Sequence, residues 1–331
     1  MREMAYVLHH NWLRLMSRKA IMAITSFMTI AAVAAALLLT SANDSRGSLA
    51  LVSAASESEG SSISGLHDFE VKRLAEAPRR SELMRNKYDA VIIDEGDGSY
   101  TIETMKSEAY ATMVRQALEH PDQPLPEAEK RGIGTNVAGF LMMFVLLQGM
   151  FYMNFFAEDR VQGTLRRMAA SPMSVMTYLA AQVLFCFLLI SVPTYLCIAG
   201  ARLLLHADIG FTLLQYGWLI AVLSLLAAAF ALFITVCIDD IDNAVTTASS
   251  LILVTSLLSG GFYTIEHEGW MNVLTYWLPQ RHFMAAVTSL ERGGAAYGDA
   301  IWPALYVFGL CCILFAAGAM ICRRRCQAGR Y

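Results

Sequence analysis

Long apolar runs, separated by shorter polar segments, dominate the hydrophobic pattern of this chain. Six of them reach the roughly 20 residues that an α-helix needs to cross the hydrocarbon core of a bilayer. They cover residues 20–40, 133–155, 174–200, 211–236, 243–263 and 301–322. The pattern therefore predicts a mainly α-helical membrane protein with six transmembrane helices. An even number of spans places both termini on one side of the membrane.

The segment that precedes the first run, residues 1–19, has an amphipathic pattern. Its apolar positions repeat at helical spacing: Met4, Leu8, Trp12 and Leu15. Its polar positions lie mostly on the other side: His9, His10, Arg14 and Arg18. This predicts an interfacial helix, although a plain charged flank to the first span is an alternative. The run that follows is longer than the about 7–15 residues of a signal peptide, so we expect a retained anchor.

Residues 41–132, between the first two runs, have the pattern of an aqueous domain. Two stretches, 88–94 and 100–105, flank the turn sequence EGDG and are predicted to be strands. Residues 107–120 follow a helical period after a capping serine. A Ser/Gly/Glu-rich stretch, residues 53–65, is expected to be flexible. We predict a small α+β domain.

The segment 264–300 is too polar to span a bilayer and too apolar for an ordinary loop. It is rich in aromatic residues and is broken by Pro279. Two short half-helices that dip into the outer leaflet fit this composition, with Trp270 and Trp277 near the interface. We therefore expect a re-entrant region before the last span.

Composition and charge support this division of the chain. Of its 331 residues, 56% are hydrophobic and 16% are charged, against about 25% charged residues in a soluble domain. Of the 28 acidic and 25 basic residues, residues 41–132 hold 17 and 11, so this domain is acidic and the rest of the chain is basic. All seven cysteines lie outside residues 41–132, so no disulfide framework is expected there.

The basic residues in the short flanks predict the orientation, because cytoplasmic loops carry an excess of Lys and Arg. If the termini are cytoplasmic, that side holds eleven: Arg2, Arg14, Arg18, Lys19, Arg160, Arg166, Arg167, Arg323, Arg324, Arg325 and Arg330. The short outer loops hold three: Arg202, Arg281 and Arg292. We predict cytoplasmic termini and an extracytoplasmic domain, residues 41–132, in a multi-pass protein of the plasma membrane.

The apolar runs lack the groups that power transport or catalysis. No ionisable residue lies near the middle of any run, and no GxxxxGK[ST], HExxH or GxSxG motif is present. Residues 258–261 read LSGG, but they end an apolar run, where two glycines indicate a turn. The metal-binding pattern of Glu266, His267 and Glu268 is weak, and a solvated interfacial run explains it more simply. We expect no catalytic, cofactor-binding or metal-binding residue in this chain. If the protein moves a solute uphill, we expect the energy to enter from outside the chain.

The segment between the second and third spans, residues 158–170, is charged and contains a glycine. Treated as one helix, it places four apolar residues on a stripe: Val161, Leu165, Met168 and Ala169. The opposite side is polar: Asp159, Arg160, Gly163, Arg166 and Arg167. Glu158 and Asp159 then lie in the first turn, where the helix dipole favours acids, and Pro172 ends the helix. We predict a short amphipathic helix on the cytoplasmic surface; an ordinary basic loop is the alternative.

The sequence EDRVQGTLRRMAASPMS in this segment resembles a loop of the type-2 ABC exporter permeases, which typically reads E-R-x-x-G-T-L-x-x-L-x-x-S-P. The matching residues are Glu158, Arg160, Gly163, Thr164, Leu165, Arg166, Ser171 and Pro172. Asp159, Gln162 and Met168 depart from the pattern. The layout of interfacial helix, outer domain, six spans and re-entrant region is also similar to that family.

The resemblance implies a permease subunit of an ATP-driven exporter. Two such subunits, identical or different, would pair in the bilayer, and each would dock on a cytosolic ABC ATPase that binds ATP and Mg; no nucleic acid is involved. The residues expected to couple the two chains are Glu158, Asp159, Arg160, Gly163, Thr164, Leu165, Arg166 and Arg167. Gly163 is expected to allow close approach of the partner backbone. Similar permeases with an outer domain export drugs, antimicrobial peptides or lipid-like molecules, and we expect a bacterial membrane.

Other polar positions leave alternatives open. Gln148, Asn154 and Gln182 lie in the second and third spans, where they are candidates for lining the pathway or for hydrogen bonds between helices. Asp242 or Asn243 is expected to cap the fifth span. Two rival functions are a membrane sensor or receptor with a ligand-binding outer domain and an intramembrane enzyme. A sensor or receptor gives no role to most of the six helices and to the re-entrant segment. An enzyme requires ionisable groups that converge within the membrane.

Overall fold

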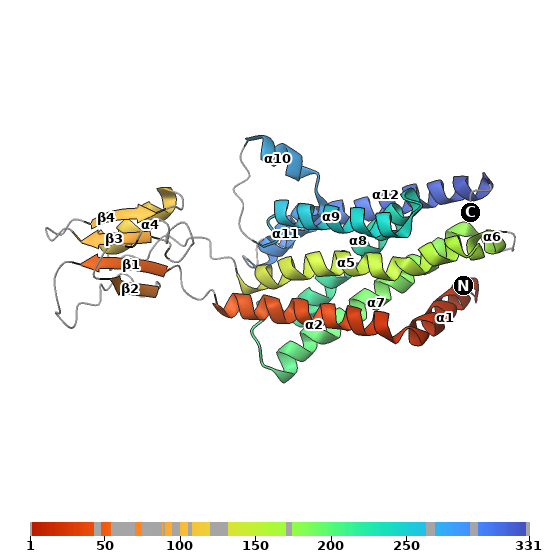
Figure 1. Cartoon of the computed structure of the whole chain (residues 1–331), viewed down its shortest axis with the longest axis horizontal. Coiled ribbons are helices and arrows are strands. Elements are labelled where there is room, and N and C mark those ends of the chain that lie inside the picture. The colour runs from red at the N-terminus through yellow and green to blue at the C-terminus, as the bar shows by residue number, and fades with distance from the viewer. Residues whose placement is uncertain are drawn as a thin grey trace. The chain divides into compact units, whose positions relative to one another are not determined.

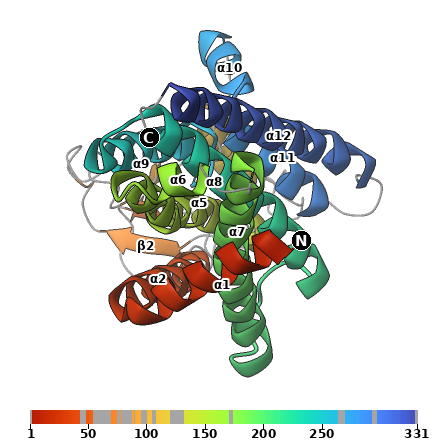
Figure 2. The same cartoon turned by 90° about the vertical axis from the view of Figure 1, so that its right-hand side faces the viewer.

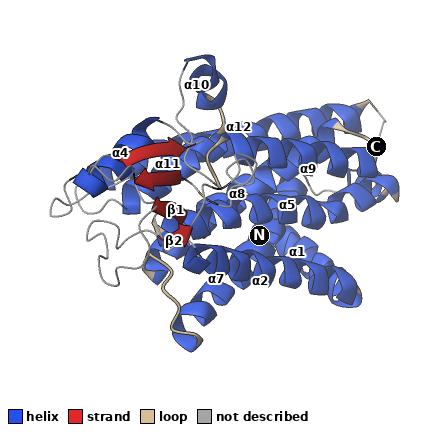
Figure 3. Cartoon of the chain, turned by 60° about the vertical axis from the view of Figure 1, so that its left-hand side comes forward, coloured by secondary structure: helices blue, strands red, loops and turns tan. Residues whose placement is uncertain are grey.

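The computed structural model divides the chain into two compact units, which are described separately. One comprises Met1–Leu38 and Arg131–Tyr331, and the other Leu39–Lys130. The structure describes residues 2–42, 48–53, 70–74, 78, 88, 90–94, 100–104, 108–119, 132–169, 174–262, 269–291 and 297–328. In this part of the chain, strands occur only in the smaller unit, as Figure 3 shows.

The smaller unit is a four-stranded sheet covered by one described helix. The elements are β1 (Ser48–Ser53), β2 (Glu70–Leu74), β3 (Ala90–Asp94), β4 (Tyr100–Thr104) and α4 (Glu108–Glu119). The strand order is β2-β1-β3-β4, with β1 parallel to both neighbours and β3 antiparallel to β4. Leu49, Leu51 and Ile92 are buried together with Val114 and Ala117 of α4. The alternating side chains of the central strands therefore pack against the apolar face of the helix.

The antiparallel pair and the helix of this unit were predicted from the sequence, but β1 and β2 were not. Strand β1 is central and contributes Leu49 to one buried cluster and Ala50 to the other. A strand buried on both faces lacks the polar–apolar alternation that identifies a strand in a sequence. Of the stretch expected to be flexible, Ser53 ends β1 and the rest lies outside the described residues. The extracytoplasmic location of this unit stays a prediction.

The secondary structure described in the larger unit is all helical (Figure 1). Among the described residues, five helices are long and apolar enough to span a membrane: α5 (Ile133–Val161), α7 (Val175–Leu204), α8 (Leu213–Cys237), α9 (Ile241–Leu258) and α12 (Tyr297–Gln327). The first predicted span is α2 (Lys19–Ala42), which follows α1 (Arg2–Ser17) at a bend of 87°. Counting that bent pair as one span gives six, the predicted number.

Helix α8 lies at the centre of this unit, in contact with α5, α7, α9 and α12 (Figure 2). The contact between α5 and α8 requires a glycine. A Cβ at Gly149 would lie 2.7 Å from the carbonyl oxygen of Ala227, which belongs to the backbone and cannot easily move away. Small residues that allow such close approach are typical of helix packing within membranes.

Two short helices occupy the segment that was predicted to be re-entrant. They are α10 (Gly269–Tyr276) and α11 (Pro279–Glu291), and Pro279 begins the second one. Proline is favoured at a first helical position, where its missing N–H costs nothing. Helix α11 packs against α12 and α5. Trp277, between the two helices, is exposed, whereas the side chain of Trp270 lies outside the described part. Entry of these helices into the membrane stays a prediction.

Candidate coupling site at the α5–α6 turn

The charged segment after the second span does not form the single helix predicted for residues 158–170. Helix α5 continues to Val161, Gln162 and Gly163 form a turn, and the six-residue α6 (Thr164–Ala169) follows. Gly163 has a φ of +65°, in the left-handed region that ends helices. Its amide donates to the carbonyl oxygen of Arg160 at 3.2 Å. The prediction of one helix was wrong because the apolar spacing continues across this glycine.

Glu158 and Asp159 consequently lie in the last turn of a helix, and not in the first turn as predicted. Acids are disfavoured there, because the unpaired carbonyl groups give a helix C-terminus a partial negative charge. Two arginines from the α1–α2 bend neutralise them. Arg14 donates to Asp159 Oδ1 at 2.7 Å and to Glu158 Oε2 at 2.9 Å, while Arg18 forms a second ion pair with Glu158. Both guanidinium groups also lie over the ring of Phe155, at 5.2 and 5.7 Å from its centroid.

Asp159 and its neighbour Arg160 face the interior of the unit, which corrects their predicted place on a solvent-facing side. Asp159 is only 4% exposed and accepts a second hydrogen bond, at 2.6 Å, from the hydroxyl of Tyr178 in α7. Arg160 is 7% exposed and donates to the carbonyl oxygens of Thr235, Ile238 and Asp239 at the end of α8. Those carbonyl groups have no partner within the helix, so a cation is favourable there.

Helix α12 joins the same network through Arg325. This arginine forms an ion pair with the carboxylate of Asp239 and donates to the carbonyl oxygen of Cys237 at 3.2 Å. The last turn of α5 is therefore linked by charged or buried hydrogen bonds to α1, α7 and α8, and α8 is linked in turn to α12. These bonds connect the α5–α6 turn to the ends of five helices: α1, α5, α7, α8 and α12.

The exposed part of the site is smaller than predicted. Of the predicted coupling residues, Arg167 is exposed and donates to the hydroxyl of Thr164 at 3.1 Å. Gly163 and Thr164 are half-buried, and Leu165 is buried in the core of the unit. The side chains of Arg166, Met168 and Ala169 lie outside the described part of the structure.

Two exposed residues belong to this surface in addition to Arg167. Val161, which was predicted to face the membrane, is 69% exposed, and Gln162 is exposed beside it. Val161 and Gln162 are exposed because α5 ends just before Gly163. This glycine was therefore the signal in the sequence for their exposure. We call Val161, Gln162 and Arg167 the exposed turn surface.

Two of the three polar residues considered for the pathway are packed between helices of this same chain. Gln148 donates to the hydroxyl of Thr29 at 2.9 Å, and Gln182 accepts from the side-chain amide of Asn11 at 2.6 Å. Both glutamines are buried, while Asn154 is half-buried. The hydrogen bonds between helices that were considered as the alternative are thus present, and a role in the pathway stays a prediction.

Sequence reasoning missed a polar face on α9. Four exposed polar residues in its first turns follow the spacings i, i+3, i+4 and i+7: Asn243, Thr246, Thr247 and Ser250. Ala244, Ala248 and Ile252 pack inward, and the exposed residues further along are apolar: Leu251, Leu253, Val254 and Leu257. We call the four exposed polar residues the α9 polar face. Its helical spacing was visible in the sequence, but which side faced outward was not.

The start of α9 differs from expectation, whereas its end agrees with it. Asp240, and not Asp242 or Asn243, caps the first turn, where its carboxylate accepts from the amide of Asn243 at 2.8 Å. At the other end, Gly260 has a φ of +77°, which agrees with a turn at LSGG.

The other candidate residues, a weak metal-binding cluster and the cysteines, do not form a further site in the described part of the chain. Glu266, His267 and Glu268 lie outside the described residues. Within the residues that the structure describes, no group of three His, Cys, Asp or Glu side chains could hold a metal ion. The seven cysteines are free, and three of them are buried in helices: Cys186, Cys311 and Cys322.

Comparison with known proteins identifies the family. The family model described as "ABC-2 family transporter protein" matches residues 77–321, about three quarters of the chain, and this region contains the α5–α6 turn and all the helices from α5 to α11. No curated protein matches the chain. Membership of this family implies a membrane transport component associated with an ABC ATPase. The match and the apolar helices together show that this chain belongs to the ABC-2 transporter family and is a multi-pass membrane permease.

Proposed function

We propose that the chain is the permease subunit of an ATP-driven exporter that moves hydrophobic or amphipathic molecules out of the cytoplasm or its inner leaflet. A second permease subunit, identical or related, completes the pathway, and a separate cytosolic ABC ATPase, which binds ATP and Mg, drives it. The termini and the α5–α6 turn face the cytoplasm, and residues 41–132 face the outside. The charge asymmetry of the short loops supports this orientation.

The observation that carries the proposal is the contrast between the exposed turn surface and the network beneath it. Val161, Gln162 and Arg167 are open to a partner. Glu158, Asp159 and Arg160, one or a few residues away, are bonded to neighbouring helices. A partner that binds the exposed residues can therefore shift the ends of the spans without breaking into the bundle. Such a surface suits an ATPase that changes shape when it binds and hydrolyses nucleotide.

The α9 polar face supports a pathway shared with a second subunit. Asn243, Thr246, Thr247 and Ser250 lie on the outside of a helix long enough to span the membrane. Amide and hydroxyl groups that face lipid lose hydrogen bonds, whereas they find partners in a second subunit or a wet pathway. The four residues of this face are uncharged, and the exposed carboxylate of Asp242 lies at the start of the helix. A stretch of neutral polar groups suits amphipathic cargo better than small ions.

Purification of the tagged full-length chain from membranes of its host, in mild detergent, tests the proposal. We expect an ABC ATPase to co-purify in stoichiometric amount, and its hydrolysis to be stimulated by amphipathic compounds. A sensor or receptor would not bring down such a subunit. Transport by the purified chain alone against a gradient would contradict the proposal.

Two matched charge reversals test the docking surface. Arg167→Glu should reduce ATPase recovery and stimulation by about tenfold, because electrostatic mismatch at an interface costs affinity. The control is Arg324→Glu. Arg324 is an exposed arginine near the C-terminal end of α12, and its reversal should leave ATPase recovery and stimulation unchanged. Unchanged ATPase recovery and stimulation in Arg167→Glu would place the docking surface elsewhere.

Direction is tested with inside-out membrane vesicles. An exporter should accumulate a fluorescent amphipathic compound inside these vesicles when ATP is added, and Thr246→Val with Thr247→Val should change which compounds are accepted. Accumulation only in right-side-out vesicles that were loaded with ATP would indicate import.

A further inference from the structure

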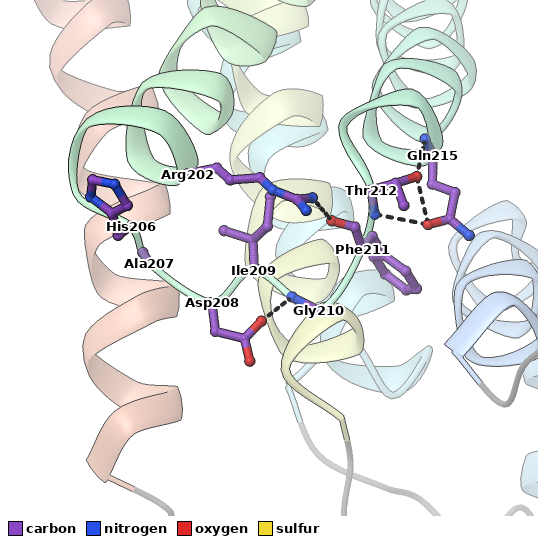
Figure 4. Close-up of a pocket in the computed structure, with 9 residues that line it drawn as sticks. All are labelled: Arg202, His206, Ala207, Asp208, Ile209, Gly210, Phe211, Thr212 and Gln215. Carbon is purple, nitrogen blue, oxygen red and sulfur yellow. Dashed lines mark hydrogen bonds between the residues drawn. The ribbon is translucent and has the colours of Figure 1, made fainter.

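A hollow of about 410 Å³ lies where α7 ends and α8 begins. Figure 4 shows the side chains that line it. Because α7 begins beside the α5–α6 turn and ends here, the hollow is at the opposite end of that helix from the coupling site. Its volume lies within the about 300–1,000 Å³ that is usual for small-ligand sites.

The hollow combines a cation with a carboxylate. Arg202 donates from Nη1 to the carbonyl oxygen of Phe211 at 2.7 Å, a bond that holds the guanidinium group in place. A guanidinium group has five N–H donors, so others remain for a ligand. Asp208 accepts from the amide of Gly210 through Oδ1 at 3.0 Å, and its second oxygen is not used in that bond. Both Arg202 and Asp208 are exposed.

His206 adds an imidazole at the edge of the hollow, on the side away from Gln215 (Figure 4). Its φ of 50° is in the left-handed region, which residues other than glycine adopt rarely. The amide of Ala207 bonds back to the carbonyl oxygen of Ala201 at 3.2 Å, which fixes this turn. The imidazole of this exposed residue can donate or accept a hydrogen bond.

Exposed apolar residues lie next in sequence to the residues that line the hollow. Three consecutive leucines at the end of α7 and one at the start of α8 are between 63% and 85% exposed: Leu203, Leu204, Leu205 and Leu214. Trp218 is exposed one turn after Leu214, and tryptophan is enriched where membrane and water meet. Polar residues that surround a hollow beside such leucines are placed for a ligand with one polar end and apolar chains.

We propose that this hollow binds the headgroup of a zwitterionic phospholipid. The phosphate accepts from Arg202 and His206, and the ammonium group donates to Asp208. The acyl chains lie against Leu203, Leu204 and Leu214. Asp208 disfavours a lipid with a purely anionic headgroup, and the leucine border gives free phosphate nothing to contact.

The test uses the full-length chain, delipidated in detergent and titrated with soluble short-chain lipids under native mass spectrometry. Dihexanoyl-phosphatidylethanolamine should bind saturably, and more tightly than dihexanoyl-phosphatidylglycerol. Asp208→Asn keeps the acceptor for Gly210 but removes the charge. It should lower the affinity for the ethanolamine lipid by about threefold to fivefold, as for the loss of an exposed ion pair. The affinity for the glycerol lipid should stay unchanged. Arg202→Gln should lower the affinity for both lipids.

Controls separate this site from the coupling function and from misfolding. His206→Asn, which tolerates the left-handed turn, should weaken both lipids while the thermal unfolding temperature stays unchanged. Arg324→Gln and Arg167→Glu should leave lipid binding intact, because they lie at the other end of the unit. Displacement of the lipid by inorganic phosphate at equal concentration, tighter binding of the glycerol lipid, or equal lipid affinity in all hollow variants would overturn the proposal.

Discussion

A carboxylate interacts with each end of α5, but the two ends differ in their electrostatics. At the N-terminal end, Glu291 of α11 accepts from the amide of Gly134 at 2.8 Å, and from the amide and hydroxyl of Thr135. At the C-terminal end, Glu158 and Asp159 belong to the helix itself. The helix dipole favours an acid at the first end and disfavours it at the second.

This difference separates a fixed end from an end that depends on its neighbours. The contact of Glu291 is favourable by itself, because the carboxylate pairs N–H groups that have no partner within the helix. The acids at the other end are neutralised by Arg14 and Arg18 of the α1–α2 region, and Asp159 also accepts from Tyr178. A partner that pulls on the α5–α6 turn therefore acts on the ion pairs of these acids and arginines. The N-terminal end of α5 stays fixed by its hydrogen bonds to Glu291.

Removing Arg14 at the C-terminal end of α5 should give the largest loss of stability. Arg14→Ala leaves the buried carboxylate of Asp159 without its ion pair, and breaking such a pair costs about 3–5 kcal/mol. We expect a much lower thermal unfolding temperature in detergent. Asp159→Asn in the same chain should restore part of the loss, because the uncompensated charge is gone. Strictly additive effects of the two substitutions would show that the residues do not interact.

Removing the anchor at the N-terminal end should cost less. Glu291→Ala loses charge-assisted hydrogen bonds to α5, worth about 2 kcal/mol. Hydrogen exchange should become faster at the amides of Gly134 and Thr135, while Glu291→Gln, which keeps an acceptor, should show about half the change. Equal effects of alanine and glutamine would mean that packing, and not hydrogen bonding, holds this end.

The close packing of the anchored end can be tested at Gly134. A Cβ there would lie 2.4 Å from the ring of Phe211, so Gly134→Ala should destabilise the unit by about 1 kcal/mol or more. Gly200→Ala is the matched control, because nothing lies within 4 Å of a Cβ at that position. Alanine is the better helix former, so this control should be neutral or stabilising by up to about 1 kcal/mol. Equal unfolding temperatures for the two variants would contradict the packing argument.

The spans could be predicted from the sequence because each needs about 20 apolar residues in a row, whatever it packs against. Their ends could not, since caps and glycines end helices after the apolar run stops. Helix α5, for example, continues from Phe155 to Val161. The charged segment was identified correctly as unusual. The partners of Asp159 lie 145 and 19 residues away in the sequence, and periodicity carries no information about such distant contacts.

The smallest expected effect separates two explanations of Gly163. Its φ of +65° makes alanine strained by about 1 kcal/mol, although a Cβ would meet nothing within 4 Å. Gly163→Asn should cost less, because asparagine tolerates the left-handed region better. If the glycine only ends α5, stimulated ATPase activity should follow stability, and the asparagine variant should be nearly as active as the parent. If a partner backbone approaches here, asparagine should remove stimulation while the unfolding temperature hardly changes. The two variants, measured for both properties, therefore show whether the open space at Gly163 is part of the docking surface.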